Sequence, residues 1–283
     1  MRFEEGRLLK EFTTFGIGGP ARYLVEVKTI AELQEAILEC NQKQLRYFIL
    51  GKGSNTLFHD KGFDGAVILN KIHFLEENEG KFYAGAGYSF SLLGSQTARK
   101  GWSGLEFASG IPGTVGGAVF MNAGANGNET FKTLTEVTFV NEKGQIEILP
   151  KSELKWGYRW TLFHERKGAI AAARFELQTS SEARQHQLTL IDYRTKTQPY
   201  SDQSAGCVFR NPKDSSAGKL IQDCGLKGIF IGGAEVSSMH ANFIVNKGSA
   251  TAQDVLSLAK LVQTTVQEKT GHLLEMEIRV ISV

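Results

Sequence analysis

The chain has few cysteines, almost no net charge and no long apolar run, and each shortage excludes a class of protein. Its three cysteines, Cys40, Cys207 and Cys224, are odd in number and lack CxxC spacing, which excludes a disulfide framework and a structural zinc site. Its 32 basic and 30 acidic residues balance too closely for a nucleic-acid-binding surface. No stretch approaches the ~20 apolar residues of a membrane span. We therefore expect a cytoplasmic protein with a small-molecule partner.

The charged start of the chain, MRFEEGRLLKEF, has no apolar region of the kind that a signal peptide carries. The histidines likewise show no metal-ligand spacing, so no metal site is expected; those considered are His59, His164, His186 and His272.

The apolar pattern predicts mixed helices and strands without a strict βαβ rhythm, which favours an α+β fold. Strands are predicted over residues 22–27, 46–50, 66–69, 82–86, 169–177 and 242–246. Helices are predicted over residues 29–44, 89–100, 182–198, 217–224 and from Thr251 to Gly271. A hairpin turn is expected at 141–144. In the last segment apolar residues alternate with Glu275, Glu277 and Arg279, which predicts a strand carrying all three on one face.

The segment 101–129 is rich in glycine and nearly uncharged, so we expect its backbone to approach another molecule closely. Consecutive amides over 110–117 could form a cradle for a phosphate, with Pro112 fixing one φ angle. The segment is neither a dinucleotide-binding GxGxxG nor a Walker loop, because no Gly-Lys-Ser/Thr follows. From the glycines alone, a glycine-rich hairpin is an equal alternative.

The segment contains four distinctive blocks: Gly104-Leu105-Glu106-Phe107, Gly110-Ile111-Pro112-Gly113, Gly116-Gly117-Ala118 and Met121-Asn122-Ala123-Gly124-Ala125. Together they resemble the signature of the UDP-N-acetylenolpyruvoylglucosamine reductases. The family belongs to a group of FAD enzymes in which such a loop holds the flavin pyrophosphate. A further block, Leu50-Gly51-Lys52-Gly53-Ser54-Asn55, resembles its second phosphate loop, with Lys52 in place of the usual glycine. The resemblance covers nearly the whole chain.

The resemblance implies an FAD-binding two-part domain of the PCMH/vanillyl-alcohol-oxidase type and a C-terminal substrate-binding α+β domain. We expect the FAD-binding parts at 1–72, joined by the terminal strand 274–283, and at 73–180, with the substrate domain at 181–273. The implied FAD contacts are Gly51, Lys52, Gly53, Ser54, Asn55, Gly110, Ile111, Pro112, Gly113, Val115, Gly116, Gly117, Asn122, Ala123 and Gly124. The short spacing from Tyr158-Arg159 to Ala169 resembles the family's shorter subtype, which lacks an extra loop.

Arg159 follows Tyr158 among aromatic residues, where a lone arginine is most often a surface or packing residue. The resemblance implies that this Tyr-Arg pair lies in the active site and that the arginine binds the substrate carboxylate. That role needs a fixed positive fork, which arginine supplies and lysine does not. Thr161 stands where the family usually has serine.

Cys207 occupies the position of a family serine whose side chain donates the proton that completes reduction; an inert buried thiol is the alternative. A thiol with a pKa of about 8.5 is mostly protonated at neutral pH and is a stronger acid than a hydroxyl. Glu277 matches the family's essential glutamate in Leu274-Glu275-Met276-Glu277, where the polar face of a terminal strand is the alternative. Facing the substrate carboxylate, it would have a raised pKa and could stabilise an enol-like intermediate. The implied substrate contacts are Tyr158, Arg194, Lys196, Asn211 and His240.

The resemblance thus implies a flavoenzyme that reduces UDP-N-acetylglucosamine enolpyruvate to UDP-N-acetylmuramate, a peptidoglycan precursor. NADPH would reduce FAD, the flavin N5 would pass hydride to C3, and Cys207 would protonate C2. The expected partner is the nucleotide sugar alone, with no nucleic acid or membrane, and the expected state is a monomer. Two alternatives stay open: a flavin oxidase of the same superfamily acting on an alcohol or hydroxy acid, and a nucleotide-sugar binder without flavin.

Overall fold

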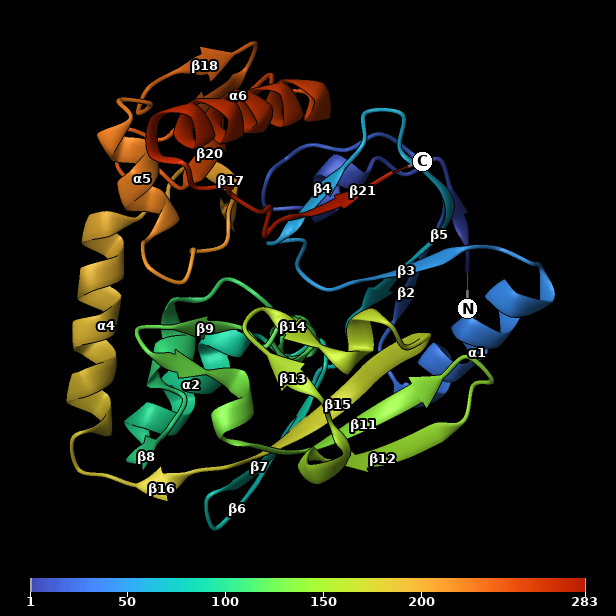
Figure 1. Cartoon of the computed structure of the whole chain (residues 1–283). Helices are drawn as coiled ribbons and strands as arrows, with labels where there is room; N and C mark the ends of the chain where they lie inside the picture. The colour runs from blue at the N-terminus through green and yellow to red at the C-terminus, as the bar shows by residue number, and fades with distance from the viewer. Residues whose placement is uncertain (1, 283) are drawn as a thin grey trace. The chain divides into compact units, whose positions relative to one another are not determined.

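The computed structural model describes residues 2–282 and divides the chain into two compact units (Figure 1). The first unit comprises Tyr23–Lys52 and Gly65–Arg194, with the start of the chain up to Glu4. The second comprises Glu5–Arg22, Gly53–Asp64 and the chain from Thr195 onward. Each unit combines helices with strands, which confirms the predicted α+β class. No helix within 2–282 is long and apolar enough to cross a membrane.

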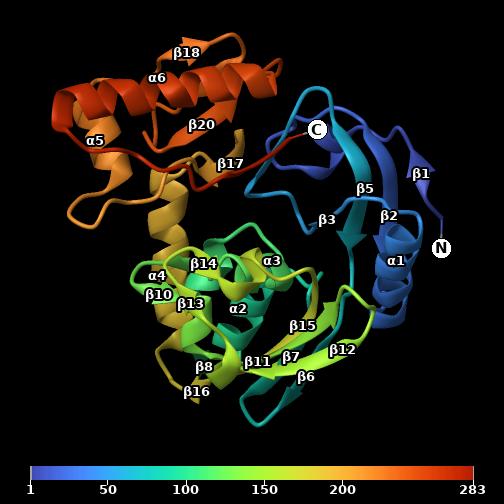
Figure 2. The same cartoon turned by 45° about the vertical axis from the view of Figure 1, so that its right-hand side comes forward.

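The first unit contains most of a four-stranded sheet, covered by helix α1 (Ile30–Gln42). The strand order is β1 (Glu4–Glu5), β2 (Ala21–Val27), β5 (Phe63–Asn70), β3 (Tyr47–Leu50). Helix α1 begins at Thr29, whose side chain and that of Glu32 cap each other's backbone amides. Its apolar face, Leu33, Ala36, Ile37 and Cys40, packs against Val25 and Val27. Figure 2 shows α1 lying along β2.

A five-stranded antiparallel sheet forms the other part of the first unit. Its order is β12 (Ile146–Pro150), β11 (Leu134–Asn141), β15 (Gly168–Glu176), β7 (Lys81–Gly85), β6 (Leu75–Asn78), and Figure 1 shows β12, β11 and β15 side by side. Helix α2 (Phe90–Arg99), the 3₁₀ turn η2 (Glu106–Gly110) and helix α3 (Val115–Phe120) share one apolar core with it. Phe90, Phe107, Phe131 and Phe139 are among the fully buried side chains there.

The turn between β11 and β12 docks on α1. The amide of Gln34 donates to Gly144 O at 2.6 Å, and that of Asn41 donates to Glu142 O at 2.5 Å. Gly144 has φ +71°, and a Cβ there would lie 2.8 Å from Leu38 Cγ, so this close approach requires glycine. This turn is one of several contacts that tie the two sheets of the first unit together, since Val140, Ala169 and Ala171 also share a core with α1.

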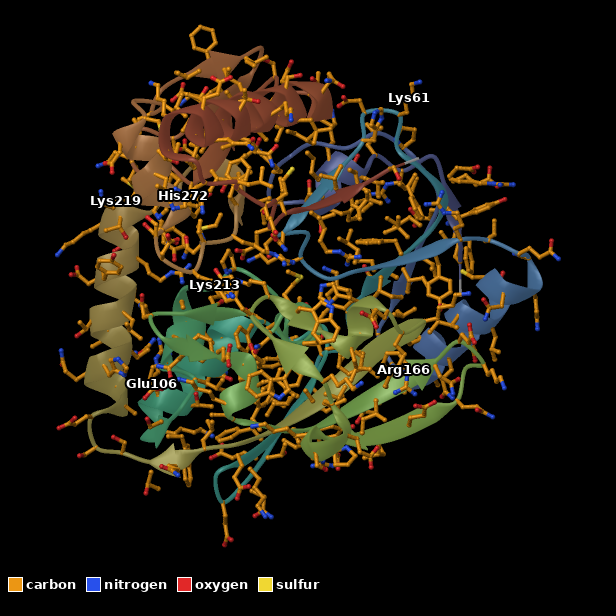
Figure 3. The ribbon with its side chains drawn as sticks, in the orientation of Figure 1. Lys61, Glu106, Arg166, Lys213, Lys219 and His272 are labelled. Carbon is orange, nitrogen blue, oxygen red and sulfur yellow. The ribbon has the colours of Figure 1, made fainter. Side chains whose placement is uncertain are left out.

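Helix α4 (Ala183–Thr197) belongs to the first unit as far as Arg194 and is polar on nearly all sides. Its buried Gln187 donates to Ser95 Oγ at 3.1 Å. His186 Nδ1 lies 3.8 Å from a carboxylate oxygen of Glu106, which is buried and labelled in Figure 3. The helix nevertheless buries a narrow face, since Ala183 and Gln187 are buried and Leu190 packs against the core of the first unit.

The second unit is a four-stranded antiparallel sheet with two helices, α5 (Ala217–Asp223) and α6 (Ala252–Thr270). The strand order is β17 (Gln203–Cys207), β20 (Phe243–Asn246), β19 (Ala234–Val236), β18 (Phe230–Ile231). Figure 2 shows α6 lying across β18 and β20. Residues from the start of the chain complete the core, since Phe15, Ile17 and Leu57 pack with the apolar face of α6.

Two further contacts in the second unit join the segment 56–60 to the C-terminal part of the chain. Asp60 accepts hydrogen bonds from the first two amides of α6, Ala252 N at 2.8 Å and Gln253 N at 3.2 Å. The last strand, β21 (Arg279–Ile281), pairs in parallel with β4 (Thr56–Phe58). Both contacts join segments that lie far apart in the sequence.

Most predicted elements are confirmed, with ends that shift by a few residues at most. Helix α6 begins at the Thr251 capping box, buries the stripe Val255, Leu258, Val262 and Val266, and ends at Gly271 in a left-handed conformation. The thiol of Cys40, predicted to lie in the core, is 0% exposed.

The predicted terminal strand is largely wrong, because only Arg279–Ile281 is a strand. Met276 forms a single antiparallel bridge with Phe209, and a bend at Ile278 follows. The chain changes partners at that bend, from the Phe209 segment to β4, so no continuous face carries Glu275, Glu277 and Arg279. The sequence predicts that strand 274–283 joins the FAD-binding part at 1–72. That assignment and the division into three parts remain predictions.

Candidate active site

The glycine-rich stretch contains the short helix α3, which the sequence did not predict. Thr114 caps it, with its side-chain oxygen accepting from Gly117 N at 3.4 Å. Val115, Ala118 and Val119 are buried in the core of the first unit. Their burial outweighs the low helix propensity of the two glycines.

Several backbone amides of this stretch already donate to protein carbonyls. Val115 N donates to Tyr88 O and Gly116 N to Ala86 O, each at 2.9 Å, while Ile111 N and Gly113 N donate to Ala108 O and Ile111 O, each at 2.8 Å. The expected cradle of consecutive amides is therefore wrong for these four residues, because their hydrogens hold the stretch to itself and to the end of β7. Their assignment as FAD contacts remains a prediction.

The two adjacent glycines of α3 have different surroundings. A Cβ on Gly116 would lie 2.8 Å from Ala86 Cβ, so packing alone requires glycine there. A Cβ on Gly117 would meet only Thr114 Oγ1, at 3.5 Å, and Gly117 is exposed. Gly117 is thus where another molecule can approach this backbone closely.

Both predicted phosphate loops meet at Thr114 in the first unit. A Cβ on Gly51 would lie 2.5 Å from Thr114 Oγ1, so the turn after β3 packs directly on the cap of α3. Lys52 is exposed and adds a positive charge beside that turn. A bare backbone at Gly117, with the Gly51 turn packed on Thr114 and a cation beside it, fits the phosphates of FAD.

The rest of the second loop, Gly53, Ser54 and Asn55, belongs to the second unit. Gly53 has φ +67°, and a Cβ there would lie 2.4 Å from Phe12 O, so the chain's own backbone requires this glycine. Asn55 O accepts from Arg279 N at 2.9 Å, and the Asn55 side chain donates to Glu277 O at 3.3 Å. Burial lowers the pKa of the Arg279 guanidinium.

Tyr158 and Arg159 form the two-residue turn of a hairpin, β13 (Trp156–Gly157) and β14 (Trp160–Thr161), in the first unit. Arg159 has φ +55°, a left-handed conformation that costs a non-glycine residue roughly 1–2 kcal/mol. Its Nη2 donates to Gly124 O at 2.9 Å, and its guanidinium lies 5.0 Å from the Tyr158 ring centre. Strain at one charged residue, held by the surrounding structure, is typical of functional sites.

The neighbouring block 122–124 supports this hairpin. The side chain of Asn122 is 0% exposed, donates to Gly157 O and to Glu129 Oε2, each at 3.0 Å, and accepts from Phe131 N at 3.1 Å. Ala123 O accepts from Thr130 N at 2.9 Å. The Asn122 side chain therefore has its contacts within the protein, and a role of these residues in FAD binding remains a prediction.

In the second unit, Cys207 and Glu277 lie on adjacent segments. Glu277 N donates to Val208 O at 2.7 Å, and Arg210 N donates to Glu275 O at 2.9 Å. Gly206 has φ +77°, and a Cβ there would lie 3.9 Å from Ser54 O. Backbone bonds thus bring the Cys207-Val208 strand end, the Glu277 segment and the Ser54-Asn55 turn together, although they are far apart in the sequence.

Asn211 and His240 both lie at the start of α5. Asn211 Oδ1 accepts from Ala217 N at 3.0 Å, and a Cβ on Gly218 would lie 3.3 Å from His240 Cε1. His240 Nδ1 also accepts from Asn242 N at 3.2 Å. The two predicted substrate contacts are therefore neighbours.

Beyond them, His272, labelled in Figure 3, places its Nε2 3.3 Å from the Asp214 carboxylate. This hydrogen bond lowers the pKa of Asp214. It joins the Asn211–Ser216 loop to the segment that leads to Glu277.

Arg194 and Lys196 both lie on α4, two residues apart. Residues at this spacing point to different sides of a helix, so they do not form one pocket for a diphosphate. The division into units also falls between them. Their role in substrate binding remains a prediction.

Thr114 and Thr161 are the site residues that the sequence did not assign. Thr161 is 0% exposed, and its Oγ1 donates to Phe120 O at 2.7 Å, which fixes β14 to the end of α3. A threonine directly before Val-Gly-Gly is a recognisable N-cap signal for Thr114. Nothing local in the sequence indicates the partner of Thr161.

Two family models match most of the chain. The family model described as "FAD binding domain" matches residues 21–149, and the model described as "UDP-N-acetylenolpyruvoylglucosamine reductase, C-terminal domain" matches 198–281. The chain is therefore an FAD-dependent oxidoreductase with a second, substrate-specific region.

The relatives define the family. Proteins named UDP-N-acetylenolpyruvoylglucosamine reductase from Protochlamydia amoebophila (strain UWE25) and Chlamydia pneumoniae are 61% and 45% identical. The matches cover 98% and 96% of this chain, and 93% and 90% of those proteins. The crystal structure of UDP-N-acetylenolpyruvylglucosamine reductase (MurB) from Thermus caldophilus superposes with a TM-score of 0.85 at 39% identity, covering 99% of each chain. The chain belongs to the UDP-N-acetylenolpyruvoylglucosamine reductases, which act in peptidoglycan precursor synthesis.

Proposed function

We propose that the chain reduces UDP-N-acetylglucosamine enolpyruvate to UDP-N-acetylmuramate with electrons from NADPH. The names of the relatives support the substrate class. The observation that supports the assignment of residues is the bond of 2.7 Å from Glu277 N to Val208 O, because it holds the backbone of Glu277 next to the residue that follows Cys207.

FAD supplies the hydride in this reaction when it is bound. The residues that would hold its phosphates are Gly51, Lys52 and Gly117 around Thr114, where the backbone is bare. In our proposal, the remaining predicted contacts in 110–116 act by shaping this surface, since several of their amides are engaged in the fold.

Arg159 binds the substrate carboxylate. Its guanidinium carries a permanent charge in a planar fork that matches a carboxylate, and the turn around it sets its direction. As the enolpyruvyl double bond is reduced at C3, negative charge develops at C2 and spreads onto that carboxylate. Arg159 is then worth more in the transition state than in the ground state, which lowers the barrier.

Cys207 donates a proton to C2, and its S–H bond breaks as the C–H bond forms. The thiolate that results takes up a proton from water before the next turnover. Glu277 stabilises the enol-like intermediate, and a backbone bond holds its main chain to the neighbouring segment. Asn211 and His240, at the start of α5, together with Tyr158, contact the nucleotide sugar.

The test uses the purified chain without substitutions. Absorption near ~450 nm is expected from bound flavin, and NADPH should bleach it under anaerobic conditions. Oxidation of NADPH should then require the enolpyruvyl sugar and yield UDP-N-acetylmuramate, identified by mass spectrometry. A colourless protein that still binds the sugar would point to a binder, and fast reoxidation by air without the sugar would point to an oxidase.

A further inference from the structure

The Arg159 hairpin is attached to the segment 120–124 at three points. Thr161 Oγ1 donates to Phe120 O at 2.7 Å, the Asn122 side chain donates to Gly157 O at 3.0 Å, and Arg159 Nη2 donates to Gly124 O at 2.9 Å. Both strands of the hairpin and its turn are thus fixed to alternate residues of one segment. All these residues lie in the first unit.

The second of these three attachments comes from Asn122, whose side chain makes three hydrogen bonds. Asn122 is 0% exposed and uses both amide hydrogens, one for Gly157 O and one for Glu129, while its oxygen accepts from Phe131 N. Asn122 also has φ +42°, a conformation that asparagine tolerates better than most residues. The turn next to Gly157 places Arg159 in the same left-handed region, at φ +55°.

We propose that Asn122 and Thr161 are positioning residues for Arg159, and this rests on the proposed role of Arg159 at the substrate carboxylate. The two side chains fix the hairpin to the segment that follows α3, so the direction of the guanidinium is set before substrate arrives. A displacement of about 1 Å at such a group can cost on the order of 10²-fold in rate. Loss of either attachment should therefore weaken the step that uses Arg159, and loss of the Thr161 attachment should leave flavin reduction by NADPH unchanged.

Thr130 offers a matched control for Thr161. Both threonines are 0% exposed, and each donates its Oγ1 at 2.7 Å to a carbonyl of the same segment, Ala123 O for Thr130 and Phe120 O for Thr161. Only Thr161 belongs to the hairpin. Thr161→Val and Thr130→Val each remove one hydroxyl bond of 2.7 Å and keep the side-chain shape, although Ala123 O still accepts from Thr130 N, so Thr130→Val should lower the melting temperature by no more than Thr161→Val.

The first experiment measures flavin content, melting temperature and both half-reactions of the holoenzyme. Thr161→Val should slow flavin reoxidation by the enolpyruvyl sugar roughly 10-fold and raise the KM for that sugar, with normal reduction by NADPH. Thr130→Val should leave both half-reactions within about 2-fold, and Thr161→Ser, which restores the hydroxyl, should recover the native rate. Equal slowing in both valine variants, or loss of flavin in Thr161→Val alone, would overturn the proposal.

A second variant isolates the Asn122 contact if Thr161→Val does not fold. The pair Asn122→Asp with Glu129→Gln keeps the bond between residues 122 and 129 with its direction reversed, and it keeps the acceptor for Phe131 N. It replaces the donor to Gly157 O with a carboxylate oxygen, which repels that carbonyl, and it moves the negative charge from residue 129 to residue 122. We expect the same slow reoxidation, and native reoxidation would overturn the proposal.

A double variant separates the positioning role of Thr161 from the proposed role of Arg159 at the substrate carboxylate. Thr161→Val added to Arg159→Ala should reoxidise no more slowly than Arg159→Ala alone, because a positioning residue acts through the group it positions. A further 10-fold loss would show that Thr161 acts independently. Native reoxidation in Arg159→Ala would instead overturn the role of the arginine, and the positioning role with it.

Discussion

The proposed chemistry depends on the guanidinium of Arg159 and the thiol of Cys207, and the protein holds these two groups in different ways. Arg159 sits in a strained turn that buried side chains, Asn122 and Thr161, fix to a neighbouring segment. Cys207 sits on a strand end whose neighbours are held by backbone bonds, chiefly Glu277 N to Val208 O. Side-chain attachment is specific to a residue type, whereas backbone attachment tolerates many sequences. The arginine hairpin should therefore be sensitive to substitutions around it, and the thiol segment sensitive mainly at Cys207 itself.

The largest effect is expected at the thiol. Cys207→Ala should lower turnover on the order of 10²–10⁴-fold, the usual loss when a general acid is removed, with flavin reduction by NADPH nearly normal. Cys207→Ser should keep substantial activity, because the hydroxyl can occupy the same place. Turnover with the enolpyruvyl sugar at increasing pH supplies the measurement.

The native enzyme should lose activity at alkaline pH as the thiolate forms, and the serine variant should lack that decline. Near-native turnover of Cys207→Ala would show that the thiol only packs and that Glu277 or water supplies the proton.

The next effect is at the arginine. Arg159→Ala should slow flavin reoxidation by the enolpyruvyl sugar on the order of 10²–10³-fold, since it removes a charge aimed at the developing negative charge. Arg159→Lys should recover little, because an ammonium cannot reproduce the planar fork. Stopped-flow absorbance resolves the two half-reactions, and equal slowing of both would make Arg159 a structural residue.

The first unit also allows a comparison between its adjacent glycines. Gly116→Val should destabilise the protein by about 1–3 kcal/mol, because its side chain would collide with Ala86. Gly117→Val has space and should keep the melting temperature of the flavin-free protein while losing flavin. The ratio of visible to ultraviolet absorbance reports flavin content, and a fully loaded Gly117→Val would show that flavin does not approach α3 there.

How far the sequence predicts this molecule depends on whether a feature is local. The capping box of α6, its apolar stripe and its glycine end lie within one segment, so pattern alone located them. The prediction of a long terminal strand is wrong because the pairing partner changes at Ile278. That change depends on two segments that lie elsewhere in the sequence. The contacts of Thr161 and Asn122 reach 41 and 35 residues along the chain, and no local pattern encodes such distances. The family signature is the source of the proposed site residues, but it does not show how they are held.

A further effect, on stability and not on catalysis, concerns a thiol outside the site. Burial, with help from the negative charge of Glu39, raises the pKa of Cys40 from 9.0 to about 11. Between these values the unfolded chain has lost the proton and the folded chain has kept it, so stability falls as pH rises through that window. The loss should reach roughly 2–3 kcal/mol by pH 11.

Denaturant titrations at pH 8 and pH 10.5 test this, with Cys40→Ala as the control. The alanine variant is less stable at both pH values, and its stability should decline less between them. Parallel declines in both proteins would show that Cys40 does not contribute to the pH dependence.

The most direct test of the account is anaerobic single-turnover reoxidation of the NADPH-reduced protein by UDP-N-acetylglucosamine enolpyruvate. Flavin absorption should return in one-to-one proportion to added sugar, rapidly for the native protein and Cys207→Ser, and at least about 100-fold more slowly for Arg159→Ala and Cys207→Ala. Equal rates in all four proteins, or a return of absorption only when air is admitted, would contradict the assignment of these residues.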